Sequence, residues 1–200
     1  MDFDFETALW RQGWQFIAGI DEAGRGPLAG PIVAAAVILL PHSRLPGLND
    51  SKLLSEQKRE QLYGLILEQA LAVGVAEVSH KTIDRLRIGQ ANTLVMEKAV
   101  KAIGFKPDYL LIDGRSSLKK LAIPQQAIID GDALCASIAA ASVIAKVTRD
   151  RIMLRYHLKH PQYNFAGHKG YGTREHFRLL KKYGPCPIHR RSFAPVAELI

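Results

Sequence analysis

Short apolar runs that alternate with longer helical patterns restrict this chain to an α/β fold more strongly than any other feature. The clearest run is "PIVAAAVILL", which is nearly all apolar and follows the shorter run "FIAGI" across a glycine-rich turn. Strands are predicted over residues 16–20, 31–40, 72–79, 109–114 and 125–130. Helices are predicted over residues 50–71, 82–103, 133–159 and 173–183. Within the first of these helices, Ser55 is a candidate N-cap.

The length and composition are those of a single globular domain spanning residues 1–200. A hydrophobic fraction of 48% is sufficient for a sizeable core, and no apolar run reaches the roughly 18 residues that span a bilayer. The acidic N-terminus lacks the pattern of a signal peptide. Cys135 and Cys186 have no metal-ligand spacing, so we expect a cytoplasmic protein without a disulfide framework.

Positive charge is concentrated in the last third of the chain. Residues 146–191 hold twelve Lys or Arg and two acids, so this segment carries +10 and the rest of the chain −2. Such asymmetry favours a polyanionic partner such as nucleic acid. The structural alternative is a solvated basic helix face without a partner.

Acidic side chains follow three of the predicted strands. Asp21 and Glu22 follow "FIAGI", Asp113 follows "YLLI", and Asp130 and Asp132 follow the run "AII". Strand ends gathered at one sheet edge form the usual sites of α/β folds, and oxygen-only ligands favour Mg²⁺ or Mn²⁺. Two such ions would support phosphodiester hydrolysis.

Each acidic position also has a structural alternative. Asp132 precedes a predicted helix and is a candidate N-cap, and Asp113 with the following glycine is a candidate turn. Asp21 and Glu22 would point to opposite faces if they lay within a regular strand. The glycines that follow them therefore predict that the strand ends at this pair.

Two glycine-containing segments are candidates for contact with a nucleic-acid backbone. The turn Gly24–Arg25–Gly26 has neither the spacing nor the following helix of a dinucleotide-binding motif, and glycines allow a backbone to approach closely. In "AGHKGYG", Tyr171 is a candidate stacking ring with Lys169 near phosphates, or else an ordinary buried tyrosine. The histidines show no zinc-finger spacing.

Six segments together resemble the bacterial ribonuclease HII family, in order and across nearly the whole chain. They are "GIDEAGRGPLAG", "NDSKLLS", "YLLIDG", "GDALCASIAAASVIAKVTRD", "HKGYGT" and "HRRSFAPV". The resemblance implies a ribonuclease H fold, with a central mixed sheet flanked by helices and a small, basic helical C-terminal part from about residue 160. One departure is Leu53, where family members often have a second lysine.

The resemblance also assigns roles to residues of this chain. The metal-binding catalytic acids would be Asp21, Glu22, Asp113 and Asp132, with Asp130 an incidental neighbour. The turn Gly24–Arg25–Gly26 would read the 2′-hydroxyl of a ribonucleotide, and Tyr171 would stack on the deoxyribose that follows. Phosphates would be approached by Ser51, Lys52, Lys146 and Lys169.

The implied activity is endonucleolytic hydrolysis of the RNA strand of RNA–DNA hybrids and cleavage 5′ to single ribonucleotides in duplex DNA. Two Mg²⁺ or Mn²⁺ ions would support the reaction, leaving 3′-hydroxyl and 5′-phosphate ends. We expect a monomer with no membrane and no small-molecule cofactor. The alternatives are another metal nuclease or strand-transfer enzyme on the same fold, a non-catalytic nucleic-acid-binding protein, and, more remotely, a nucleotide-binding oxidoreductase.

Overall fold

A five-stranded mixed sheet forms the centre of the computed structural model, which describes residues 3–200; residues 1 and 2, where the expected domain begins, lie outside it. The strand order is β3-β2-β1-β4-β5. The strands are β1 (Ile17–Ala23), β2 (Ile32–Leu39), β3 (Ala70–Val78), β4 (Tyr109–Asp113) and β5 (Gln125–Ile128). The first three strands pair antiparallel, and β4 and β5 join β1 as a parallel half. The mixed sheet expected from the sequence is therefore confirmed.

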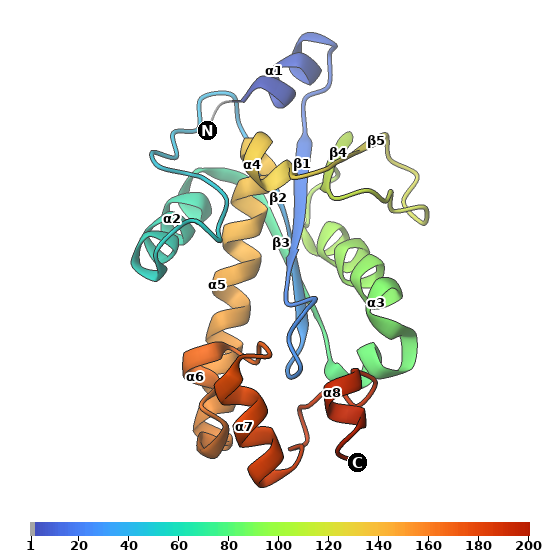
Figure 1. Cartoon of the computed structure of the whole chain (residues 1–200). Coiled ribbons are helices and arrows are strands. Elements are labelled where there is room, and N and C mark those ends of the chain that lie inside the picture. Colours follow the sequence, from blue (N-terminus) through green and yellow to red (C-terminus); the bar gives the residue numbers. More distant parts are fainter. Residues whose placement is uncertain (1–2) are drawn as a thin grey trace.

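Helices cover both faces of this sheet (Figure 1). The helices are α1 (Asp4–Arg11), α2 (Glu56–Gln69), α3 (His80–Ala102), α4 (Gly131–Leu134), α5 (Ala136–Lys159), α6 (Phe165–His168), α7 (Arg174–Tyr183) and α8 (Ala194–Ala197), with a 3₁₀ turn over Pro161–Tyr163. Alternate residues of β2 divide between the layers, because Ala34 and Ala36 pack with α3 while Ala35 and Val37 pack with α5.

A glycine in the central strand lets α5 lie close to the sheet. A Cβ at Gly19 of β1 would overlap the backbone of Ser137 at the start of α5. The small residues of α5, most of which are fully buried, continue this close contact along the helix. The packing therefore sets the distance between α5 and the end of β1, where the predicted acids lie.

Three expected element boundaries were wrong. The first strand does not end at Asp21, because β1 continues its pairing with β2 as far as Ala23. The helix predicted from residue 50 begins only at Glu56, where Ser55 caps it by accepting from the Lys58 N–H at 3.2 Å. The helix predicted over 133–159 is divided into α4 and α5 at Cys135, whose backbone is extended.

Helix α1 was not predicted, and its Glu6 supports the start of α5. This carboxylate is buried and accepts from the Ser137 backbone N–H at 2.8 Å and from the Ser137 hydroxyl at 2.6 Å. An anion at a helix N-terminus pairs with free N–H groups and with the positive end of the helix dipole. The N-terminal helix is thus tied to the layer that carries the site.

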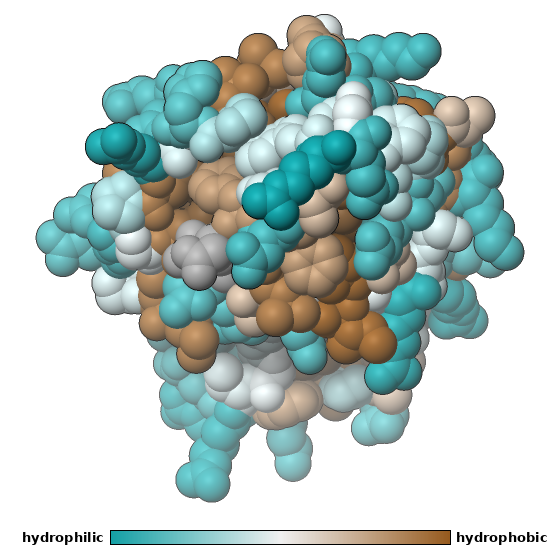
Figure 2. Space-filling view, turned by 90° about the horizontal axis from the view of Figure 1, so that it is seen from above, coloured by the Kyte–Doolittle hydropathy of each residue, from teal (hydrophilic) through white to brown (hydrophobic). Residues whose placement is uncertain are grey.

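The C-terminal part is helical, as expected, with α6, α7 and α8 gathered at the far end of α5 (Figure 1). Two residues of the turn after β1 connect to it, since Ala29 forms a β-bridge with His189 and the Leu28 N–H donates to the Gly170 carbonyl at 2.8 Å. Figure 2 views the opposite end of the molecule, where hydrophilic side chains project from the surface and separate several hydrophobic areas. Within residues 3–200, no helix combines the length and apolarity needed to cross a membrane.

Candidate active site

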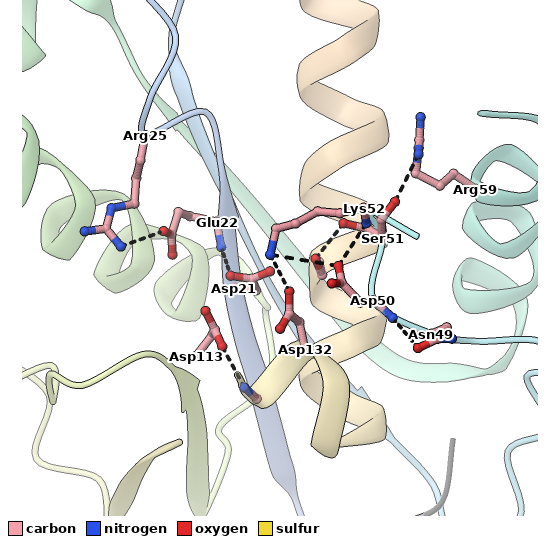
Figure 3. Close-up of polar contacts among 12 residues, drawn as sticks. Asp21, Glu22, Arg25, Asn49, Asp50, Ser51, Lys52, Arg59, Asp113 and Asp132 are labelled. Atoms are coloured by element: carbon pink, nitrogen blue, oxygen red, sulfur yellow. Dashed lines mark hydrogen bonds and ion pairs between the residues drawn. The ribbon is translucent and has the colours of Figure 1, made fainter. Parts of the chain in front are cut away.

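The two acids of β1 project to opposite sides of the sheet edge. Asp21 faces the same side of β1 as Ala23, which packs with α5. Asp21 is 4% exposed. Glu22 faces the other side of β1, together with Ile20, which packs with α3. Figure 3 shows that both carboxylates nonetheless lie at the same edge as Asp113, so a continuous strand brings them to one site.

Asp113 and Asp132 complete the acidic group from the neighbouring strand and from α4. Asp113 is the last residue of β4, and its carboxylate accepts from the Gly131 N–H at 2.8 Å. Asp132 lies inside α4 and is buried, so it does not cap α5 as the structural alternative supposed. The Gly131 bond positions Asp113 beside the helix turn that carries Asp132.

Burial and mutual repulsion make these carboxylates poor anions in the protein alone. Burial raises the pKa of Asp21 well above its usual range, and the neighbouring Glu22 and Asp113 charges raise it further. Burial also raises the pKa of Glu22 and of Asp113, the latter with a contribution from Asp132. Such a group of acids favours protons or bound cations.

A lysine ammonium already neutralises one of the acids. Lys52 Nζ lies 2.7 Å from Asp132 Oδ2 and 3.9 Å from Asp50 Oδ1, and the Asp132 bond raises the pKa of Lys52 (Figure 3). Its neighbour Ser51 is held against α5 by a 2.9 Å hydroxyl contact with Ser142. The segment that was expected to approach phosphates is therefore fixed next to the acids.

One cavity of about 410 Å³ gathers most of the predicted site. Its lining includes ten predicted residues, namely Asp21, Glu22, Gly24, Arg25, Gly26, Ser51, Lys52, Asp113, Lys146 and Tyr171. Asp132 is joined to this lining through Lys52. A second cavity of about 590 Å³ shares Arg25 and Asp113 and also contains the exposed Asp130.

Tyr171 is not a buried tyrosine, since it is 39% exposed at the cavity wall. Its ring lies 5.7 Å from Lys146 Nζ and 5.5 Å from Arg149 Cζ. The predicted residue Lys169 is not among the lining residues, and its ammonium donates to the Ala166 carbonyl. A ring flanked by cations provides a flat surface beside positive charge, which suits a sugar-phosphate chain.

The turn after the acids is fixed by residues that the sequence interpretation did not single out. Gly24 has a φ of +101°, and a Cβ there would overlap the Arg149 side chain. Arg149 and Arg190 are both fully buried. Arg190 donates to the Gly24 carbonyl of the turn, and Arg149 donates to the Pro31 carbonyl at the end of the same connection between β1 and β2. The distribution of charge alone predicts that both arginines belong to a basic surface. The only signal of a different role in the sequence is that each lies in a segment that resembles the family, Arg149 in "GDALCASIAAASVIAKVTRD" and Arg190 in "HRRSFAPV".

The carboxylates are gathered more loosely than in a preformed metal cage. Among residues 3–200, no three His, Cys, Asp or Glu side chains are close enough to hold one metal ion. The donors are all oxygens, which suits hard cations. Mg²⁺ is usually bound by one or two carboxylates, water and substrate phosphates, so the residues present fit a site that substrate completes.

Comparison with known proteins gives one consistent family. The family model described as Ribonuclease HII matches residues 18–196. A ribonuclease HII of Bacillus licheniformis is 59% identical over 194 residues, which cover 96% of this chain and 74% of that protein. A ribonuclease HII of Geobacter metallireducens is 54% identical, covering 97% of this chain and 91% of that protein.

A comparison with solved structures agrees with the family. The crystal structure of ribonuclease H2 from Pyrococcus horikoshii matches with a TM-score of 0.79 and 27% identity, over 92% of this chain and 96% of that one.

Proposed function

The chain belongs to the ribonuclease HII family and is a ribonuclease H that acts on RNA–DNA hybrids, and we propose that it also cuts duplex DNA on the 5′ side of a single ribonucleotide. The observation that carries this proposal is the 410 Å³ cavity in which three of the four acids adjoin the glycine turn and Tyr171. The products would carry 3′-hydroxyl and 5′-phosphate ends.

Asp21, Glu22, Asp113 and Asp132 would hold two divalent cations, Mg²⁺ or Mn²⁺, together with the scissile phosphate. When bound, such ions activate a water nucleophile and stabilise charge on the attacking and leaving oxygens. The acids supply the negative charge that retains the cations, and the burial of Asp21 and Asp132 strengthens this attraction.

The remaining lining residues would select and orient the substrate. The turn Gly24–Arg25–Gly26 follows the acid pair after a single residue, Ala23, so a ribose held by the turn would have its 5′ phosphate next to the carboxylates. Tyr171 would stack on the following deoxyribose. The 2′-hydroxyl distinguishes RNA from DNA at the selected position and is not the nucleophile.

Polar and positive residues around the cavity would contact the flanking phosphates. Ser51 and Lys52 lie on one side of it and Lys146 beside Tyr171, whereas Lys169 would have to leave the Ala166 carbonyl to take part. We further propose that residues 1–200 act as one catalytic domain, as a cytoplasmic monomer.

The test uses an end-labelled DNA duplex with one embedded ribonucleotide beside an identical all-DNA duplex, each with Mg²⁺, Mn²⁺ or EDTA. We expect one cut, 5′ to the ribonucleotide, only with a divalent cation and only in the first duplex. Cutting of both duplexes would indicate a general nuclease, and no cutting of the first under any metal would reject the proposal.

A matched pair of variants connects this result to the acids. Asp132→Asn should abolish cutting, because a neutral amide cannot balance a cation's charge. Asp130→Asn, two residues away, should cut like the wild type, since Asp130 is exposed and asparagine tolerates its left-handed φ of 54°. Equal effects of the two substitutions would contradict the assignment of Asp132.

A further inference from the structure

Two buried arginines stand out because nothing acidic pairs with them. Arg149 lies on α5 and Arg190 lies between α7 and α8, and both are 0% exposed. Among the ion pairs of residues 3–200, neither guanidinium has a carboxylate partner. Burying a charge is costly unless its hydrogen bonds are satisfied. Both side chains instead donate only to backbone carbonyls.

These carbonyls belong almost entirely to the segment that contains the glycine turn. Arg190 donates to Gly24 O at 2.6 Å, to Arg25 O at 2.9 Å and to Gly30 O at 3.0 Å. It also reaches Pro31 O at 3.2 Å. The planar guanidinium is suited to bridging several acceptors, which the ammonium of a lysine cannot do in the same geometry.

The two shortest of these bonds fix which way the turn presents its N–H groups. The peptide bonds of residues 3–200 are not cis, so each carbonyl points opposite to the N–H of the next residue. Arg190 draws the carbonyls of Gly24 and Arg25 inward, which directs the N–H groups of Arg25 and Gly26 away from it. Both of these residues line the 410 Å³ cavity.

These two N–H groups are free to bind a ligand. Within the described part of the chain, neither the Arg25 nor the Gly26 N–H donates to a protein acceptor. A carbonyl that accepts from a cation polarises its peptide unit and strengthens the N–H donor on the other side. The turn therefore presents two oriented, polarised donors to an oxygen acceptor in the cavity.

Arg149 joins the later part of the connection between β1 and β2 to the loop that carries Tyr171. Its guanidinium donates to Ala29 O at 3.2 Å, to Pro31 O at 3.0 Å and to Lys169 O at 3.0 Å. Its Cζ lies 5.5 Å from the Tyr171 ring. The two arginines thus hold the turn and the aromatic ring in one fixed relation, from buried positions that are not part of the cavity lining.

From these contacts we propose that Arg190 is a positioning residue for ribose selection: it aims the Arg25 and Gly26 N–H groups at the 2′-oxygen of the substrate, while Arg149 fixes the spacing to Tyr171. This inference rests on the proposed cleavage at a single ribonucleotide. It concerns how the turn is held, and it assigns no new role to the acids or to the cations that they would bind.

The test compares the affinity for the ribonucleotide duplex with that for the all-DNA duplex, in an Asp113→Asn background with Mg²⁺ so that nothing is cut. Adding Arg190→Lys should lower the ratio of the two affinities at least tenfold and change the all-DNA affinity less than about twofold. Arg151→Lys is the matched control, since Arg151 lies on α5, is exposed and pairs with Glu60 at 2.5 Å. An unchanged ratio, or an equal loss on both duplexes, would overturn the proposal.

A second measurement does not depend on whether the Arg190 variant folds. Amide resonances of Arg25 and Gly26 in the Asp113→Asn protein should shift on addition of the ribonucleotide duplex and stay in place with the all-DNA duplex. Identical shifts with both would overturn the inference. Failure of the proposed function has a different readout: the wild-type protein would not cut the ribonucleotide duplex, whatever the amide shifts show.

Discussion

Gly26→Ala should separate the stability of the turn from its use by the substrate. Gly26 is exposed, its φ lies outside the left-handed region, and a Cβ built there meets no atom within 4 Å. Alanine therefore fits the metal-free protein without strain. A Gly→Ala change at a compatible site stabilises by about 0.4–1 kcal/mol through the unfolded chain. For a chain of this size the melting temperature should rise by about 1–4 °C.

Substrate binding should respond in the opposite direction. The added methyl group would stand on the cavity wall, beside an N–H that we assign to the ribose. Inserting a methyl group into a close-packed contact costs about 1–3 kcal/mol. At about 1.4 kcal/mol for each factor of ten, kcat/KM on the single-ribonucleotide duplex should fall about 5- to 150-fold.

Thermal melting and cleavage rates of two variants check this reasoning. Gly64→Ala is the control, because Gly64 lies inside α2, away from the cavity, and its Cβ also meets nothing within 4 Å. It should raise the melting temperature and leave cleavage unchanged. If Gly26→Ala cleaves within twofold of the wild type, the turn does not touch the substrate, and a lower melting temperature would show that the space around it was misjudged.

Three other predictions concern the acids, the Tyr171 ring and two buried histidines of the C-terminal part, His176 and His189. Asp21→Asn or Asp113→Asn should abolish cleavage and leave duplex binding in a gel-shift assay largely intact; cleavage at the wild-type rate would exclude the metal site. Tyr171→Ala should slow cleavage about tenfold at a single ribonucleotide, since base and sugar stacking contributes about 1–3 kcal/mol, and less on a long hybrid; equal losses would assign Tyr171 a structural role. Burial lowers the pKa of His176 and His189 to about 4, against about 6.5 in the unfolded chain. The contribution of these neutral rings to the free energy of unfolding is therefore fully present above about pH 6.5 and is lost as the pH falls from about 6.5 to about 4. The melting temperature should drop by several degrees between pH 7 and pH 5, and a constant value would contradict this account.

Local pattern was sufficient for the sheet and for the strand-end acids, but not for the length of β1. Glycines at 24 and 26 suggested that the strand ends at Asp21, yet Glu22 and Ala23 still pair with Ala34 and Val33 of β2. Pairing with a neighbouring strand is a non-local interaction that a single sequence does not display. The turn begins only where this pairing stops.

The break between α4 and α5 has a similar cause. Residues 133–159 contain no glycine or proline, so local propensity predicts one helix. The helix is instead interrupted at Cys135, whose backbone is extended. The short α4 before it is fixed separately, because Asp130 takes a left-handed φ and the Gly131 N–H donates to Asp113, eighteen residues earlier. A tertiary hydrogen bond therefore decides where Asp132 lies.

The basic C-terminal third was understood only in part. Its charge predicted a surface for a polyanion. This stays a prediction for Lys146 beside the cavity, whereas Arg149 and Arg190 are both fully buried and belong to no surface. Their acceptors lie 118 to 166 residues earlier, apart from Lys169 O. Because a charged residue is rarely buried without a carboxylate, composition alone could not indicate this arrangement.

The position of the acid pair explains why the C-terminal part is needed at the site. Asp21 and Glu22 point to opposite faces of β1, so the strand must stay paired through both of them before the chain turns. The turn then leaves the sheet edge beyond the last strand pairing, where the sheet no longer orients its peptide groups. Arg190 provides that orientation from the end of the chain. The cleavage chemistry therefore depends on the sheet, whereas the proposed choice of ribose depends on a residue 165 positions away from Arg25 of the turn. Substitutions at Arg190 should accordingly lower the selectivity for a ribonucleotide and leave the positions of the four acids unchanged.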